Sequence, residues 1–321
     1  MTHPPHFDVI AVGLNAVDVL ARLPEKIIPD TKHIVKELMI QGGAPVGTGS
    51  AAVAMLGYPT AFVGRLGNNT LSEISIDQCK KYGVSADLIV RDDISRPALA
   101  LVEIDPATAA RTVFVNLDDY GFLHKEDIPV DIIRSARVLM VDSYDLDATE
   151  WALEAAHGSA CRTMLDFESG DTERMRRLLA FGTDIILPLE CGRQLSGKIS
   201  PEDVLAELAK VTSGQLVVTD GAHGSWGLKN DAVIHLPAMH VVEKIDSTGC
   251  GDAYHAGYVV GLLEGWPLEE RMEFGTLLAS RVIGKVGGRT ALPRRKDLAA
   301  MAGTGVSISL QKHLNQFNKQ A

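Results

Sequence analysis

A short run of glycines that ends in an aspartate is the part of this sequence best suited to chemistry. The run is Asp246-Ser247-Thr248-Gly249-Cys250-Gly251-Asp252-Ala253; a strand is predicted before it at 241–245, and a helix rich in small residues is predicted to begin within it. Glycines let the backbone approach a ligand closely, and the first amides of a helix have no partner inside the helix. Such amides favour anions, including a phosphoryl group that gains charge during transfer. Asp252, in the first helical turn, could accept the proton of a bound hydroxyl.

The same residues have a plainer interpretation, in which Asp252 caps the helix and the glycines form a tight turn. The neighbouring residues favour chemistry, because the run from Asp246 to Ala253 resembles the C-terminal signature of the ribokinase-like (PfkB) carbohydrate kinases. That signature usually has alanine at the position of Cys250. The resemblance implies that Asp252 is the catalytic base and that the amides of Gly249, Cys250 and Gly251 form the anion hole.

The first part of the chain resembles the sugar-binding half of the same family. Asp18, a few residues after Gly13-Leu14-Asn15, is similar to the aspartate that holds sugar hydroxyls, and Gly42-Gly43 with Leu56-Gly57 resembles the N-terminal signature. Arg65, in the strand and turn at 62–69, could reach an anionic substrate group or make a structural salt bridge. The substrate-binding residues that the resemblance implies are Asn15, Asp18, Gly42, Gly43, Thr48 and Arg65.

Thr48 marks a departure from the family pattern. Counted back from Gly57, it stands where the family has a substrate-binding asparagine, so that a hydroxyl replaces an amide and the hydrogen bonds offered to the substrate change. Ribose is therefore disfavoured. The threonine variant is similar to members that act on ketoses or modified hexoses, including sulfofructose kinases.

Two glycine-containing loops resemble the nucleotide side of the family. The loop from Thr219 to Gly224 matches a Thr-x-Gly-x-x-Gly pattern, and a strand rather than a helix is predicted after it, which disfavours a dinucleotide-binding fingerprint. The loop 287–291 resembles the segment that flanks adenine and, in many members, a monovalent cation near Asp246. ATP and Mg²⁺ are therefore expected cofactors, and K⁺ is an open hypothesis. The expected nucleotide-binding residues are Thr219, Gly221, Gly224, Gly249, Gly251 and Gly287.

The magnesium region also departs from the family. Its usual Asn-x-x-Glu motif is missing, and the segment 186–193 keeps one acid, Glu190, directly after a predicted strand. Glu190 could bind Mg²⁺ through water, because magnesium keeps several waters and needs few carboxylates; a surface glutamate is an equal alternative. Asp166, at a strand end, could face the nucleotide or the metal. Cys250 is expected to have a lowered thiol pKa at a helix N-terminus.

The elements that must position these residues alternate along the chain. Strands separated by helices imply a mostly parallel sheet covered on both faces. The helix at 70–82 is expected to begin with a Thr70–Glu73 capping box, and the one at 200–211 with Ser200 as N-cap and Pro201 after it. Strands are predicted at 7–14, 60–64, 138–141, 163–167, 184–187 and 216–219, and helices at 47–57, 70–82, 147–157, 172–181, 200–211, 251–264 and 268–286.

A β-rich pair of segments, 98–104 and 111–116, breaks this alternation. The turn residues at 105–108 between them predict a hairpin, and a further extended piece is expected at 33–40. The resemblance implies a β lid formed by inserted segments at about 17–40 and 96–117, which closes over the sugar and mediates a homodimer. The predicted fold class is α/β, a ribokinase-like three-layer fold with a central, mostly parallel sheet and a small β-sheet lid, in one domain over 1–321. The tail after Gly303 is weakly patterned and gives no prediction.

Composition excludes several classes of function. Against 41 acidic residues stand 31 basic ones, so the formal charge is −10 and neither a nucleic acid nor an anionic membrane is an expected partner. The four cysteines lack metal or disulfide spacing, which is typical of reduced cytosolic thiols. No signal peptide is evident at 1–6 and no apolar run reaches 18 residues. These features predict a soluble cytoplasmic protein.

The predicted function is that of an ATP-dependent kinase acting on a ketose, a sugar acid or a modified hexose. One alternative is a nucleoside kinase of the same superfamily, because fold and motifs do not identify the substrate. The other is a non-catalytic sugar or nucleotide sensor. The altered Asn-x-x-Glu region favours a sensor, whereas Gly249, Gly251 and Asp252 argue against it because a binder needs no base.

Overall fold

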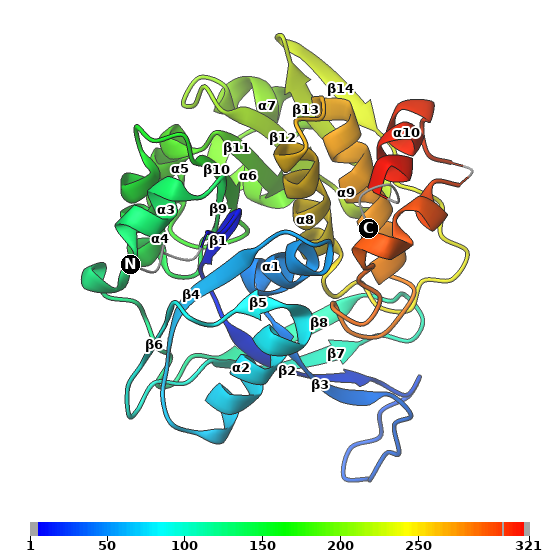
Figure 1. Cartoon of the computed structure of the whole chain (residues 1–321). Helices are drawn as coiled ribbons and strands as arrows, with labels where there is room; N and C mark the ends of the chain where they lie inside the picture. Colours follow the sequence, from blue (N-terminus) through cyan, green and yellow to red (C-terminus); the bar gives the residue numbers. More distant parts are fainter. Residues whose placement is uncertain (1–5, 304, 318–321) are drawn as a thin grey trace.

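The computed structural model describes residues 6–303 and 305–317 and is built around a ten-stranded sheet with helices on both faces (Figure 1). The strand order is β14-β13-β12-β11-β10-β9-β1-β4-β5, with β6 also paired to β4; β13 and β14 are antiparallel to their neighbours and the other pairs are parallel. The strands are β1 (Val9–Val12), β4 (Thr60–Leu66), β5 (Val84–Ser85), β6 (Ile89–Arg91), β9 (Val138–Asp142), β10 (Arg162–Asp166), β11 (Asp184–Pro188), β12 (Gln215–Thr219), β13 (Ser225–Lys229) and β14 (Ala232–Leu236).

Two hydrophobic cores cover the two faces of this sheet, because successive side chains of a strand point to opposite sides. In β1, Val9 and Ala11 enter one core, whereas Ile10 and Val12 enter the other. The first core contains α1 (Pro45–Met55), α2 (Thr70–Tyr82), α8 (Cys250–Leu263), α9 (Leu268–Val282) and α10 (Ile308–Phe317), and the second contains α3 (Val130–Ser135), α4 (Leu146–Ala156), α5 (Thr172–Leu178), α6 (Leu189–Ser196) and α7 (Pro201–Leu208).

A separate four-stranded sheet, in the order β3-β2-β7-β8, lies below the main sheet in Figure 1. Its strands fall within or beside the predicted insertions: β2 (Ala16–Arg22), β3 (Leu38–Gly43), β7 (Ala98–Ile104) and β8 (Arg111–Asn116). In β7, Ala98, Ala100, Val102 and Ile104 are buried while Leu99 and Leu101 are exposed, so one face of this sheet packs on the protein and the other faces solvent.

Most of the predicted elements are present, including the hairpin at 98–116. Ser200 caps α7 as expected, since its side chain accepts a hydrogen bond from the amide of Asp203, with proline in the first turn. The predicted Thr70–Glu73 capping box is wrong. Asn69 is the N-cap of α2, and its side chain accepts from the amide of Ser72 at 3.0 Å, because an asparagine one residue earlier fits the extended N-cap backbone.

Two further expectations were wrong in detail, and one helix was missed. No strand forms at 241–245; Val242 is 94 % exposed there, so the segment buries too little apolar surface to join the sheet. The last long helix ends at Val282 rather than 286, where Gly284 and the glycines at 287 and 288 stop it. Helix α6 was not predicted, since a proline precedes it and its apolar positions are few. The ends of the predicted domain, 1–5 and 318–321, lie outside the described residues.

Candidate active site

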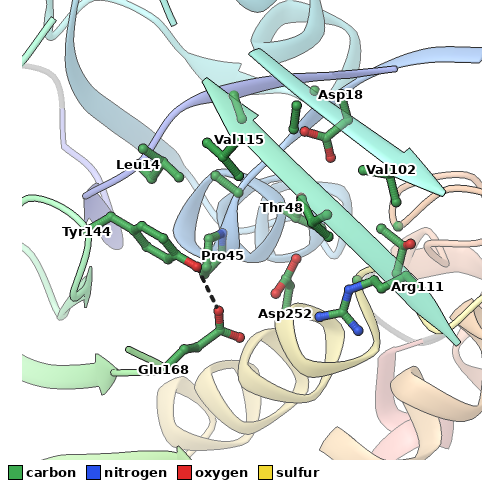
Figure 2. Close-up of a pocket in the computed structure, with 18 residues that line it drawn as sticks. Leu14, Asp18, Pro45, Thr48, Val102, Arg111, Val115, Tyr144, Glu168 and Asp252 are labelled. Atoms are coloured by element: carbon green, nitrogen blue, oxygen red, sulfur yellow. Dashed lines mark hydrogen bonds between the residues drawn. The ribbon is translucent and has the colours of Figure 1, made fainter. Parts of the chain in front are cut away.

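A cavity of about 220 Å³ lies between the small sheet and the ends of the central strands (Figure 2). One wall is the loop after β1 together with the start of α1, and the opposite wall is the inner face of β7 and β8. The first turn of α8 forms the floor, where Asp252 points into the space. Since carboxyl ends of parallel strands lie at this edge, the fold brings polar groups from distant segments together here.

The floor combines the glycine-containing start of a helix with a carboxylate. Gly249 is the N-cap of α8 at φ 76°, and a Cβ on it would collide with the backbone of Gly288, so glycine is required there. A Cβ on Gly251 would meet nothing within 4 Å, which leaves open space beside this glycine. The amide of Cys250 donates to the carbonyl of Ser247 at 3.3 Å. Gly249 and Asp252 both line the cavity. The structure therefore brings together the base and the anion hole that the signature predicts.

Asp252 has an environment that favours its neutral form. Burial raises its pKa to about 8, and the negative charge of Glu168 adds to this effect, while Arg111 and Arg289 oppose it. A carboxylate whose pKa lies near neutrality can both take up and release a proton at working pH. Perturbed acids of this kind cluster at functional sites.

Thr48 lines the cavity, and a buried arginine stands behind it. Arg289 donates from Nε to Thr48 Oγ1 at 3.2 Å and from Nη2 to the carbonyl of Gly43 at 2.9 Å. Arginine has no acceptor, so the threonine oxygen must accept this bond and its own hydrogen is left for another partner. Thr48 therefore offers a hydrogen-bond donor to whatever occupies the cavity.

Asp18 and the two glycines of the N-terminal signature lie together. Asp18 lines the cavity; burial raises its pKa to about 6, and Arg289 and Arg111 lower it. A Cβ on Gly43 would collide with the Asp18 carboxylate, and one on Gly42 with the Arg289 guanidinium. Asn15 does not line the cavity; its Oδ1 accepts from Ser75 Oγ at 2.8 Å.

Some expected site residues lie away from this cavity. Arg65 pairs with Asp92 and Asp127, which is the structural alternative that the sequence left open. Glu190 is in the first turn of α6 with its side chain 70 % exposed and paired with Arg193. The loop residues Thr219, Gly221 and Gly224 follow the end of β12 and are likewise not among the lining residues.

Asp246 joins the two glycine segments. Its Oδ1 accepts from the amide of Thr248 and its Oδ2 from the amide of Gly287, both at 2.7 Å. Since the carboxylate bonds both segments, it fixes Gly287 and Gly288 against Gly249. The expected monovalent cation at Asp246 stays a prediction.

The expected lowering of the Cys250 pKa is wrong. Burial raises the pKa of this thiol to about 12, and Sγ lies 3.7 Å from the carbonyl oxygen of Ala279. The side chain therefore packs against α9 instead of facing the cavity, and desolvation outweighs the effect of the helix N-terminus.

Four polar residues of the site were not identified from the sequence as cavity residues. Glu168, Tyr144 and Arg111 line the cavity, and Tyr144 donates its hydroxyl to Glu168 at 3.4 Å (Figure 2). Arg289 supports Thr48 from behind. Of these, Glu168 carried a signal, since it lies two residues after the strand-end Asp166; the other three depend on side-chain directions that the pattern does not encode.

A second buried pair lies beneath the floor. His255 Nδ1 is 2.8 Å from the Gly251 carbonyl and 3.3 Å from Asp166 Oδ2, and its Nε2 is 3.2 Å from the Ile186 carbonyl. Burial raises the pKa of Asp166 and lowers that of His255 to about 4. The other Asp166 oxygen, Oδ1, is buried without a hydrogen-bond partner.

The acidic side chains near the cavity are too few to bind a metal ion by protein ligands alone, but they fit a magnesium ion that keeps its water ligands. Within residues 6–303 and 305–317, no group of three or more His, Cys, Asp or Glu side chains could hold a metal. Magnesium needs one or two carboxylates besides phosphate and water. The unpartnered Oδ1 of Asp166, together with Glu168 on the cavity wall, fits that requirement.

A small cavity that is lined by an aspartate and a helix start, with a small sheet over it, is compatible with a kinase for small hydroxyl compounds. Residues 8–295 match the model of the pfkB family carbohydrate kinases, and the chain belongs to that family. The chain is 26 % identical over 312 residues to the 5-dehydro-2-deoxygluconokinase of Geobacillus thermodenitrificans, covering 89 % of this chain and 90 % of that protein.

Solved structures share the fold at low identity. The Arabidopsis thaliana ribokinase complexed with ribose and ATP superposes with a TM-score of 0.78 at 20 % identity, covering 92 % of this chain and 99 % of that one. The Thermotoga maritima ribokinase gives a TM-score of 0.76 at 19 % identity, with coverage of 98 % and 99 %. The ribokinase-like fold prediction is therefore confirmed, and the chain is an enzyme of the carbohydrate kinase class. No helix in the described part of the chain has the length and apolar character needed to cross a bilayer.

Proposed function

We propose that this protein transfers the γ-phosphoryl group of ATP to a hydroxyl of a ketose or a sugar acid, with Asp252 as the general base. The observation that carries the proposal is the position of Asp252: its carboxylate faces a sugar-sized cavity beside the open space in front of Gly251. A binding protein has no need for a carboxylate with a raised pKa at that place.

The residues divide the reaction between them. Asp252 accepts the proton of the acceptor hydroxyl while the hydroxyl oxygen bonds to the γ-phosphorus and the bond from that phosphorus to the β-phosphate oxygen breaks. The amides at 249–251 hold the charge that develops on the phosphoryl oxygens. The products are ADP and the sugar phosphate, and Asp252 later releases its proton to solvent.

ATP and Mg²⁺ are implied by the family. Asp166 and Glu168 would hold the ion through water, and the ion would neutralise phosphate charge. The loop 219–224 and the segment at Gly287 are the expected nucleotide contacts. A K⁺ requirement remains a prediction, which equal turnover in potassium, sodium and tetramethylammonium buffers would contradict.

The donors at Thr48 favour a substrate with an acceptor oxygen. Because Arg289 Nε already supplies a hydrogen to Thr48 Oγ1, the threonine hydroxyl can donate to a carbonyl or carboxylate oxygen. The positive charge of Arg289 lies directly behind, with no carboxylate within 4.0 Å in the described residues. Ketoses and sugar acids carry such oxygens, and the Geobacillus relative is named for a sugar acid.

The test is ATP consumption coupled to ADP detection, with 5-dehydro-2-deoxygluconate, fructose, sulfofructose, ribose and nucleosides as acceptors. Turnover is expected on a keto sugar or a sugar acid, and Asp252→Asn should lower kcat by about 10³-fold or more with its melting temperature kept. Full turnover by Asp252→Asn would overthrow the assignment of the base. Selective turnover of a nucleoside would support the nucleoside-kinase alternative. If no acceptor is turned over but one of them raises the melting temperature of the protein, the sensor alternative is supported.

A second copy of the chain would cover the outer face of the small sheet. Across this face Ile40, Val19, Leu101 and Phe114 form one row of paired positions, and Ile40, Leu101 and Phe114 are 43–57 % exposed. Exposed apolar rows of this kind mark interaction surfaces. Light scattering should give twice the mass of one chain, and Phe114→Asp should give the single mass; a monomer in the unmodified protein would contradict the proposal.

A further inference from the structure

Arg111 is the cationic side chain of the cavity whose role the proposed function leaves open. It is the first residue of β8, and its guanidinium projects from the small sheet toward Asp252 (Figure 2). Within the described part of the chain no carboxylate lies within 4.0 Å of it. Other arginines of the molecule, such as Arg65 and Arg96, do pair with carboxylates. Arg111 thus keeps its charge available to a ligand.

Two hydrogen bonds connect the hairpin that carries this arginine to the segment before Gly249. The amide of Ser247 donates to the carbonyl of Ala109 at 2.9 Å, which ties the turn of the β7–β8 hairpin to the segment before Gly249. Arg111 Nη1 in turn donates to the carbonyl of Ser247 at 3.4 Å. The guanidinium is therefore fixed two residues from the first glycine of the amide cradle, while most of its donors remain unused.

The electrostatic surroundings place the same group between two acids. The charge of Arg111 lowers the pKa of both Asp252 and Asp18, so it acts on both ends of the cavity without pairing with either carboxylate. An additional anion at the anion hole would give the unused guanidinium donors a partner. A planar fork of donors matches the oxygens of a phosphoryl group.

We propose that Arg111 is a catalytic residue that the small sheet delivers to the active site, where it contacts the oxygens of the transferring phosphoryl group. The proposal rests on the proposed phosphoryl transfer to a sugar. As the hydroxyl oxygen bonds to phosphorus and the bond to the leaving ADP oxygen breaks, the guanidinium stabilises the charge on the phosphoryl oxygens, and Asp252 takes the proton. The amides at 249–251 and Arg111 then approach the phosphoryl group from two sides. The site is complete only with the small sheet in the position seen here.

The test compares Arg111→Met with Arg22→Met, a lid arginine on β2 that pairs with Glu37 and does not line the cavity. Arg111→Met should lower kcat by about 10²–10³-fold with the KM of the sugar changed by less than about threefold, since the contact forms mainly in the transition state. Arg111→Lys keeps the charge but loses the planar fork of donors, so its kcat should lie between those of Arg111→Met and the unmodified chain. Arg22→Met should keep full kcat.

A binding measurement extends the test without any acceptor sugar. By calorimetry with Mg²⁺, Arg111→Met should bind the β,γ-imido analogue of ATP about tenfold more weakly than the unmodified chain and bind ADP within about twofold. The acid limb of the kcat/KM profile should also move to higher pH in this variant, because removal of the positive charge raises the pKa of Asp252.

The outcomes separate this proposal from the proposed function. An inactive Asp252→Asn beside a fully active Arg111→Met would overturn the role of Arg111 alone, whereas an active Asp252→Asn would overturn the proposed function itself. Equal loss of affinity for ADP and the imido analogue would also contradict a contact with the γ-phosphoryl group. If instead the KM of anionic sugars rises while kcat and the imido-analogue affinity stay unchanged, Arg111 binds the sugar and the proposal is wrong.

Discussion

The aspartates Asp184 and Asp252, at opposite ends of the central strands, have different surroundings. At the amino end, Asp184 is fully buried and its carboxylate accepts from Arg162 and Arg271, each within 3.1 Å, and from Tyr258 at 2.9 Å. At the carboxyl end, Asp252 has no ion-pair partner within 4.0 Å in the described residues, and burial raises its pKa to about 8.

This difference is the one expected between a structural acid and the proposed catalytic base. A buried charge with two arginines and a tyrosine is satisfied by the protein itself, and it holds β11 to α8 and α9. A carboxylate left without such partners is less stable as an anion, and the proposed acceptor hydroxyl would give it a partner. Asp184 is fully buried and has two arginine partners, whereas Asp252 is only partly buried and has no ion-pair partner among the described residues.

Replacing the structural acid Asp184 should have the largest effect on the free energy of unfolding. Asp184→Asn leaves two arginines next to a neutral amide, so the free energy of unfolding should fall by about 3–5 kcal/mol, measured by urea unfolding. The kcat of the molecules that remain folded should be unchanged. Glu73→Gln, which removes an exposed partner of Arg91, is the matched control and should change stability by less than about 1 kcal/mol. A similar loss of stability in Asp184→Asn and Glu73→Gln would show that the buried ion pairs of Asp184 have no special structural role.

Neutralising Asp252 should stabilise the folded protein, by an amount that depends on pH. The pKa of Asp252 in the folded chain, about 8, lies above its ordinary value of 3.8. The folded state therefore favours the protonated form, and its stability falls as pH rises from about 3.8 to about 8. Asp252→Asn removes that cost. Its melting temperature should exceed that of the unmodified chain slightly at pH 5 and by a larger margin at pH 9. A lower melting temperature at pH 9 would show that Asp252 is a structural acid like Asp184.

A smaller effect is expected from the hydroxyl at the cavity wall. Thr48→Val keeps the shape and removes the donor, so the KM of the keto sugar or sugar acid should rise about tenfold, and the buried Arg289 Nε loses its acceptor. Thr48→Ser, which retains the hydroxyl, is the control, and its KM should stay within about threefold of that of the unmodified chain. Equal KM values for the valine and serine variants would show that Thr48 does not contact the substrate.

The smallest effect is expected at the thiol beside the anion hole. Burial raises the pKa of Cys250 to about 12, so iodoacetamide should alkylate it slowly at pH 7.5, with or without ATP. Cys250→Ala restores the residue that the family usually has and should keep kcat within about twofold. Rapid alkylation that ATP prevents would place the thiol in the cavity with Asp252.

Much of the fold could be predicted from local patterns. Runs of four to eight mostly apolar residues predicted the central strands, and small or capped segments predicted most helices. Both patterns depend on which side chains must leave water. Asn69 and the segment 241–245 show the limits. The choice between neighbouring N-cap residues depends on backbone angles, and an apolar run becomes a strand only where a sheet edge can accept it.

The sequence by itself determined the catalytic run, because glycines at 249 and 251 and an acid at 252 are local requirements of a helix start that binds an anion. The surroundings of that run were decided by tertiary structure. Arg111 comes from 141 positions earlier in the chain, and Thr48 receives its hydrogen bond from Arg289, 241 positions away. The raised pKa of Asp252 and the packing of Cys250 arise from burial, which only the assembled layers create.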